Sequence, residues 1–200
     1  MGKRRLAAAL EQYRERFPDA APPAVRWLPF QLNPDLPESG IARTEYLRRK
    51  FGNPNRSYAN VAAAGASVGI PFAFDRITVQ PNTVNAHRLM HYADQHGRQD
   101  EAAEELFRGY FIEGADLTDR AVLAELGARA GLDRAALVDY LAGDADRELI
   151  ARADSEARNA GIGGVPFFIF NRRVGVSGAQ EPETLLEAIA QAEKAVSPEA

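Results

Sequence analysis

Gly164-Val165-Pro166-Phe167-Phe168-Ile169-Phe170 is the stretch that decides the fold of this 200-residue chain. Its apolar, aromatic run follows a helical pattern and ends at Asn171-Arg172-Arg173, which predicts a strand that runs into a turn. A second short apolar run, Val174-Gly175-Val176, predicts the partner strand of a β-hairpin. Pro182 then opens a final helix, because proline is tolerated in the first helical turn.

The N-terminal part adds one helix and one extended segment. Apolar residues recur at helical spacing between Leu6 and Phe17, and Pro18 ends this helix. The following segment, Val25–Leu32, alternates apolar and polar residues. We therefore expect a strand there, which Pro29 moves toward a sheet edge or a strand end. Both ends of the chain thus carry the elements of an α/β domain.

The middle of the chain has a helical character. Alanine-rich segments with helical periodicity alternate with breaks, and Gly97 and Gly131 are expected helix stops. Asp119 and Asp133 are expected N-caps, since their side chains can accept hydrogen bonds from the first free N–H groups of a helix. The predicted helices are Thr44–Phe51, Arg56–Val68, Thr83–His96, Asp100–Phe111, Asp119–Arg129, Asp133–Ala142 and Arg147–Ala160.

Composition and charge exclude several classes of protein. Hydrophobic residues make up 46% of the chain, so disorder is not the default. The net charge of −4, with mixed signs, lacks the clustered basic face of a nucleic-acid-binding protein. No apolar run is long enough to span a membrane, and Glu11 and neighbouring charges distinguish the N-terminus from a signal peptide. We therefore expect a cytoplasmic protein without nucleic-acid or membrane partners.

Cysteine is absent from the sequence. Consequently no residue of this chain can form a disulfide, act as a thiolate nucleophile or bind a metal through sulfur.

His87 and His91, four residues apart on one expected helix face, form a candidate metal pair. Asp94 is the sole further ligand nearby, so a polar helix face is the favoured interpretation, and we assign no metal site.

Several motifs, in order along nearly the whole chain, resemble those of the DsbA-like thioredoxin-fold oxidoreductases. The match is closest to the FrnE-type branch, which is related to 2-hydroxychromene-2-carboxylate isomerase and kappa-class glutathione transferase. Each motif is weak by itself, and their common order makes the resemblance specific. The motifs are Gly2-Lys3-Arg4-Arg5-Leu6, Trp27 to Pro34, Pro81-Asn82-Thr83 with Ala86-His87-Arg88, Gly164 to Phe168, and Val176-Ser177-Gly178-Ala179-Gln180.

The resemblance implies an α/β, thioredoxin-like fold with a large all-helical insertion. Residues 1–38 and 160–200 would form the thioredoxin-like domain and residues 39–159 the insertion. It also implies a cis peptide bond between Val165 and Pro166, with the loop facing the redox motif and presenting its backbone to an extended substrate. From the residues alone a trans bond is favoured, because only about one X–Pro bond in twenty is cis.

The same resemblance indicates what is missing. In the family a first, central strand and a Cys-x-x-Cys motif lie directly before the residues that Gly2 and Lys3 match. Without that strand, the segments Val25–Leu32 and Phe167–Phe170 lose a shared neighbour. We expect the natural product to carry this segment upstream of Met1, which the genomic sequence would test. The alternative is a natural variant that repairs the sheet differently, for instance with a partner strand.

Three functions remain open at this point. The first is thiol–disulfide exchange, inactive in this chain because the cysteine pair is absent. The second is a glutathione-dependent isomerase or transferase, and the third a non-catalytic module that binds peptides as a chaperone does. The expected partner is a thiol or disulfide protein or a glutathione-like molecule, and glutathione would act as substrate or as reductant. We expect no bound cofactor. A homodimer is compatible with the sequence. The family match implies a substrate-binding role for Gly164, Val165, Pro166, Asn82, Ser177 and Gln180.

For three of these residues a plainer structural role is open. Asn82 is favoured as a helix cap, and Ser177 and Gln180 lie in a loop before a helix N-terminus. Such a loop can either dock an anionic group or simply cap the helix.

Overall fold

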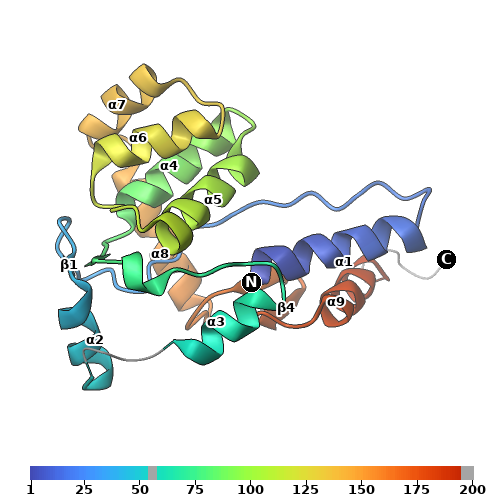
Figure 1. The fold of residues 1–200 in the computed structure, drawn as a ribbon. Helices are drawn as coiled ribbons and strands as arrows, with labels where there is room; N and C mark the ends of the chain where they lie inside the picture. Colours follow the sequence, from blue (N-terminus) through green and yellow to red (C-terminus); the bar gives the residue numbers. More distant parts are fainter. Residues whose placement is uncertain (54–57, 195–200) are drawn as a thin grey trace.

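The computed structural model describes residues 1–53 and 58–194. The predicted helix Arg56–Val68 begins outside the described residues, and its described part is α3. Figure 1 shows the order of the elements along the chain. They are α1 (Gly2–Arg16), β1 (Ile41–Ala42), α2 (Arg43–Phe51), α3 (Ala59–Ala66), η1 (Phe74–Arg76), β2 (Val79–Gln80), α4 (Val84–Gln95), α5 (Gln99–Arg108), η2 (Gly109–Glu113), α6 (Arg120–Arg129), α7 (Arg134–Ala142), α8 (Arg147–Asn159), β3 (Phe167–Phe170), β4 (Val174–Ser177) and α9 (Pro182–Lys194).

The two ends of the chain pack together. Helices α1 and α9 lie side by side (Figure 1), and β3 pairs antiparallel with β4, with Phe167 opposite Ser177. The core between them contains Ala9, Tyr13, Leu185, Leu186 and Ile189, with Phe168, Phe170 and Val176 of the hairpin packed against it. The predicted first helix, hairpin and final helix are therefore confirmed.

The helical insertion has a core of its own. Leu89, Leu123, Leu137 and Leu141 are fully buried between α4, α6 and α7. The predicted N-caps are confirmed, since the carboxylate of Asp119 accepts from Ala121 N at 2.7 Å and that of Asp133 from Ala136 N at 2.9 Å. Gly97 and Gly131 follow α4 and α6 with φ angles of 65° and 90°, as expected of helix stops.

Two features of the insertion were not expected. Residues Ile41–Ala42 pair antiparallel with Val79–Gln80, so the predicted all-helical insertion contains a small β ladder. The expected helix Asp100–Phe111 ends at Arg108 and continues as a π-helix through Glu113. A two-residue ladder and a change in helical pitch leave no pattern long enough to recognise in a sequence.

The predicted strand Val25–Leu32 is wrong. In Figure 1 the chain after α1 runs back toward the helical bundle as a long extended segment, and it belongs to neither of the two-stranded sheets among the described residues. The alternation of side chains correctly predicted extended backbone, but a ladder also needs a neighbour. The two described sheets contain only β1 with β2 and β3 with β4, and neither has the central strand that the resemblance places before Gly2.

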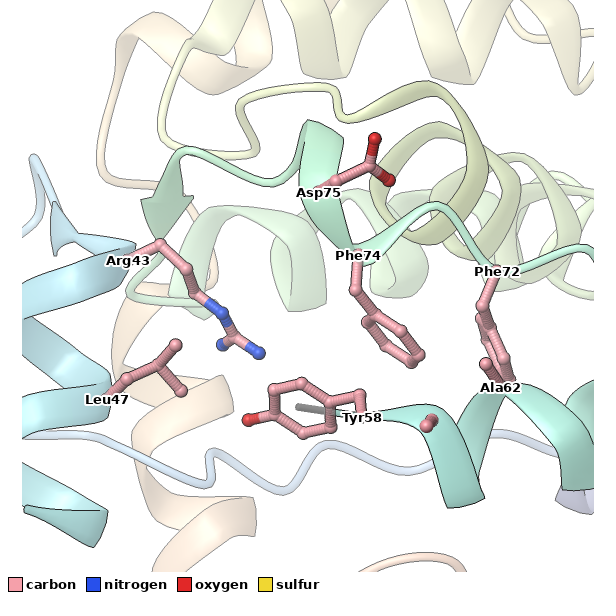
Figure 2. A pocket seen from close by; sticks show the side chains of 8 residues that line it. Arg43, Leu47, Tyr58, Ala62, Phe72, Phe74 and Asp75 are labelled. Carbon is pink, nitrogen blue, oxygen red and sulfur yellow. The ribbon is translucent and has the colours of Figure 1, made fainter. Parts of the chain in front are cut away.

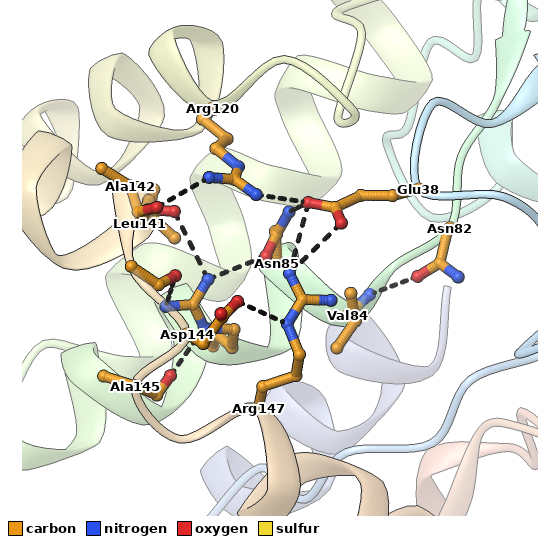
Figure 3. A network of polar contacts seen from close by, with 12 residues as sticks. Glu38, Asn82, Val84, Asn85, Arg120, Leu141, Ala142, Asp144, Ala145 and Arg147 are labelled. Carbon is orange, nitrogen blue, oxygen red and sulfur yellow. Dashed lines mark hydrogen bonds and ion pairs between the residues drawn. The ribbon is translucent and has the colours of Figure 1, made fainter.

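A polar network, buried at Asn85 and Arg88 and exposed at Glu38, joins the loop before β1 to the bundle (Figure 3). The guanidinium of Arg88 is fully buried and donates to the carbonyl oxygens of Tyr140 and Gly143, each at 2.8 Å, and of Ala145 at 2.7 Å. Glu38 accepts from Arg120 at 2.6 Å, and this contact is the main reason that its pKa falls to about 2.

Among the described helices, none has the length and apolar content needed to span a membrane.

Candidate functional site

The turn before β3 is the centre of the candidate site. The peptide bond between Val165 and Pro166 is cis. The carbonyl oxygen of Pro166 accepts a hydrogen bond from Gly178 N at 2.9 Å, which ties the turn to the end of β4. Val165 is 50% exposed, although it is a large apolar residue. The turn is thus held from the hairpin side while Val165 is open to solvent.

The N-terminus of α1 lies against this turn. A Cβ atom on Gly2 would stand 2.9 Å from Cγ of Pro166 and 3.4 Å from the Phe168 ring, closer to the proline than packed side chains normally come. Met1 is the N-cap residue, and its side chain forms no capping hydrogen bond with the helix. The positive end of the helix dipole therefore lies beside Pro166.

Basic side chains add positive charge at this helix end, and the acidic residues paired with them offset part of it. Burial chiefly, and then the charges of Arg4 and Arg5, lower the pKa of the Met1 amino group. Arg5 forms an ion pair of 2.7 Å with Glu181 and donates to the carbonyl oxygen of Ala179, so it links α1 to the loop before α9. Because a thiolate is stabilised by positive charge and by a helix N-terminus, this position suits thiol chemistry.

The same helix end is also linked to the insertion. Lys3 forms ion pairs with Asp100 at 2.9 Å and with Glu104 at 3.0 Å, and Arg4 pairs with Glu104 as well. Asp100 in addition accepts from the indole N–H of Trp27 at 3.3 Å. Helix α5 thus forms a side wall of the candidate site.

Side chains of the insertion take the place of a neighbouring strand along the extended segment. The backbone N–H of Trp27 donates to Oε1 of Gln99 at 2.8 Å, and Nε2 of Gln99 donates back to the Trp27 carbonyl at 3.0 Å. At Gln31 the N–H donates to Asp154 at 2.6 Å, and the carbonyl accepts from Arg158. These contacts satisfy backbone groups that a strand would otherwise pair, which is why the segment is extended without a ladder.

Apolar side chains are exposed on both segments that would flank a central strand. Leu28 is 68% exposed and Leu32 56%, and on the hairpin side Ile169 is 50% exposed. Within residues 1–53 and 58–194, the backbone groups of Leu28 have no protein hydrogen-bond partner. Exposed apolar residues beside open backbone groups are the features by which proteins bind an extended peptide.

The structure brings most of the predicted substrate-binding residues together. Gly164, Val165 and Pro166 form the turn itself, and Ser177 lies opposite Phe167 in the hairpin. Gln180 donates to the Ser177 carbonyl at 2.9 Å, which closes the loop before α9.

Asn82 makes different contacts. It donates to the Leu36 carbonyl at 2.7 Å and accepts from Val84 N at 2.9 Å, so it joins the preceding loop to the first residue of α4, whose N-cap is Thr83. The substrate-binding role of all these residues stays a prediction.

The two histidines have separate partners. Nε2 of His87 lies 3.2 Å from the Phe30 carbonyl, whereas His91 contacts Gln95 at 3.0 Å. Burial lowers the pKa of His87 to about 4, against the opposing effects of the Phe30 carbonyl and Asp154. In the part of the chain that the structure describes, no group of three or more acidic or histidine side chains could hold a metal ion.

Three site residues were missed in the sequence. Gln99, Asp154 and Arg158 hold the extended segment, yet each lies in a helix rich in charged residues. Asp154 and Arg158 are four residues apart, a spacing typical of an ordinary surface ion pair. Nothing in that spacing indicates contact with a segment more than 120 residues away.

A helix N-terminus packed on a cis-proline turn, with a hairpin and a second helix behind it, defines a thioredoxin-like domain. Residues 1–190 match the family model described as DSBA-like thioredoxin domain, and the chain belongs to this family. Its structure is similar to the crystal structure of a probable DsbA oxidoreductase from Streptomyces coelicolor, with a TM-score of 0.85 and 30% sequence identity. That match covers 100% of this chain and 86% of the other. A comparison with curated proteins found no significant match.

Proposed function

We propose that this chain forms the substrate-binding part of a DsbA-like enzyme of thiol–disulfide exchange. The single observation that supports the proposal best is the contact of Gly2 with Pro166, which places a positive helix end beside an open turn. In such exchange a thiolate attacks one sulfur of a disulfide, a mixed disulfide forms, and the other sulfur leaves as a thiolate. Since the sequence has no cysteine, the reacting sulfurs must come from outside these 200 residues.

The proposed substrate is an extended polypeptide that carries a thiol or a disulfide. Val165 and Ile169 on the hairpin side, and Leu28 and Leu32 on the other, would contact its apolar side chains. Its backbone would pair with groups that are open along both segments, as in strand addition. Glutathione is the small molecule that could take the place of this polypeptide as substrate, or could serve as the reductant.

The test places a thiol at the helix end. A Met1→Cys variant, released from a cleavable leader so that cysteine is the first residue, carries its sulfur at the N-cap of α1. The dipole and the basic side chains should lower the thiol pKa, and burial should oppose them. The matched control is Ser67→Cys, whose exposed thiol lies at the C-terminal end of α3, where the dipole has the opposite sign.

We expect the Met1→Cys thiol to have the lower pKa and to form mixed disulfides faster with a disulfide-bearing peptide. The readouts are thiol titration by absorbance and mass spectrometry of the mixed disulfide, each with the peptide and with glutathione disulfide. The unmodified chain should give no insulin reduction. Equal pKa values and equal rates for the two variants would contradict the proposed role of the helix end.

A second function, peptide binding without redox chemistry, is favoured by one observation. Leu28 and Leu32 are exposed beside open backbone groups, and binding there needs no sulfur. The unmodified chain should then bind a fluorescent unfolded peptide, and Leu28→Ser should weaken that binding. If the peptide binds while the Met1→Cys thiol reacts no faster than the Ser67→Cys thiol, the binding function is preferred.

A further inference from the structure

A cavity of about 390 Å³ lies in the insertion, between α2, α3 and the η1 turn (Figure 2). Its lining includes none of the residues at the Pro166 turn or along the extended segment. The volume is within the range of pockets that bind small organic molecules. The residues that determine its chemistry are Arg43, Leu47, Tyr58, Phe72, Phe74 and Asp75.

One wall of the cavity is a row of stacked aromatic rings. The centroids of Tyr58 and Phe74 are 4.9 Å apart with the planes 29° from parallel, and those of Phe72 and Phe74 are 4.9 Å apart at 26°. Figure 2 shows the three side chains gathered on one side of the cavity. A flat, apolar ligand could extend such a row, because aromatic rings favour offset stacking.

A cation projects toward this row. The guanidinium carbon of Arg43 lies 5.3 Å from the ring centre of Tyr58 and 5.3 Å from that of Tyr46, and Figure 2 shows the group pointing toward Tyr58. Of its five N–H donors, only one on Nη1 has a hydrogen-bond partner among the described residues, the side chain of Gln80. No described carboxylate forms an ion pair with Arg43 within residues 1–53 and 58–194.

The acidic and phenolic groups nearby do not neutralise this charge. Glu45, on the same helix, pairs with Arg48 and with Arg49. Burial raises the pKa of Tyr110 to about 12, so the phenol is neutral, and it donates to the Val79 carbonyl at 3.3 Å. Asp75 also lines the cavity, and in Figure 2 its carboxylate points away from the guanidinium.

We propose that this cavity is a binding site for a small aromatic monocarboxylate. The carboxylate would accept hydrogen bonds from the free donors of Arg43, in the bidentate geometry that a guanidinium favours. The ring would pack against this aromatic wall beside Tyr58, because Phe74 is already stacked between Tyr58 and Phe72. A second anionic group is disfavoured, because it would approach the carboxylate of Asp75.

The probe is phenylacetate, titrated into the full chain labelled with ¹⁵N and followed by two-dimensional NMR. We expect saturable shifts at residues 43, 58–62 and 72–75, with a Kd on the order of 1 mM, as suits a ligand of this size. Phenylacetamide has the same shape without the charge and should bind about tenfold more weakly or worse. Absence of saturable shifts at these residues, or equal binding of phenylacetamide and of the cation phenethylamine, would overturn the proposal.

Variants test the role of the cation separately. Arg43→Gln should weaken phenylacetate binding about tenfold. Arg43→Lys keeps the charge but loses the paired N–H donors of the guanidinium, and should weaken binding less. The control is Arg49→Gln on the same helix, an exposed position that should leave binding unchanged. Circular dichroism confirms that each variant is folded, and an Arg43→Gln variant that is folded and binds as tightly as the unmodified chain would refute the site.

Discussion

Oδ1 of Asp154 accepts a hydrogen bond of 2.6 Å from the backbone N–H of Gln31, 123 residues away in the chain. Asp154 is buried, and its other oxygen holds Arg158 at 2.9 Å, which in turn donates to the Gln31 carbonyl. One carboxylate thereby fixes both polar groups of a residue in the extended segment. Loss of this carboxylate should release the segment from α8.

An Asp154→Ala variant should lose about 2–3 kcal/mol of unfolding free energy, because a buried N–H and a guanidinium lose their partner. Amide hydrogen exchange at residues 25–32 should accelerate more than exchange in α9. The control is Asp144→Ala, which removes an exposed carboxylate paired with Arg147 and should change stability by under about 0.5 kcal/mol. Unchanged exchange at residues 25–32 would show that Asp154 does not hold the segment.

The close packing of Gly2 on Pro166 gives a second prediction. A methyl group at Gly2 would meet a proline ring that cannot rotate away, so Gly2→Ala should cost about 1–3 kcal/mol and shift the NMR signals of the turn. Gly163→Ala is the matched control, since nothing lies within 4 Å of its added methyl. If both variants have the same stability and the same turn spectrum, the contact is looser than described.

Arg88 carries the third prediction. It is fully buried, so Arg88→Met would leave the carbonyl oxygens of Tyr140, Gly143 and Ala145 without their donor. We expect a loss of about 3 kcal/mol or more, measured by urea denaturation. Arg98→Met, at an exposed arginine whose partner Glu101 is three residues on, should have almost no effect. Equal midpoints for the two variants would argue against a structural role for the buried guanidinium.

The fourth prediction concerns pH. The folded-state pKa of His87, about 4, lies below the value of 6.5 for an unperturbed histidine, so the unfolded chain binds the proton first. The stabilisation by neutral His87 is complete above about pH 6.5 and is lost as the pH falls toward 4, about 2 kcal/mol of it by pH 5. His87→Gln keeps a donor for the Phe30 carbonyl but does not titrate, so its stability should fall less between pH 7 and 5.

The comparison uses denaturation curves at several pH values. His96→Gln, at an exposed position just after α4, should keep the pH dependence of the unmodified chain. A His87→Gln variant with that same pH dependence would mean that His87 is not the group responsible.

Local features of the fold were predictable from the sequence, and long-range ones were not. Asp119, Asp133, Gly97 and Gly131 act within a few residues of their own position, so the chain pattern alone identifies them. The ladder expected at Val25–Leu32 is absent, because pairing depends on a distant partner that alternation does not encode.

The polar interior was missed for a related reason. Arginine is rarely buried, and Arg88 shares its helix with polar residues such as His87, His91 and Asp94, so no sequence pattern predicts that it lies inside. At the candidate site the turn around Pro166 was recognised because its residues are contiguous. The contributions of Gln99 on α5 and of Asp154 and Arg158 on α8 come from two helices, and only the folded chain brings them together.

The hold on the extended segment has an evolutionary consequence. A strand within a sheet is paired through backbone groups, which every residue except proline provides in full, so its pairing tolerates most substitutions. At Trp27 and Gln31 the pairing groups are instead an amide, a carboxylate and a guanidinium of particular side chains. A single nucleotide change in the codon for Gln99 or Asp154 can therefore loosen one point of attachment and leave the other intact. Related proteins can vary the freedom of this segment step by step, without redesigning a sheet.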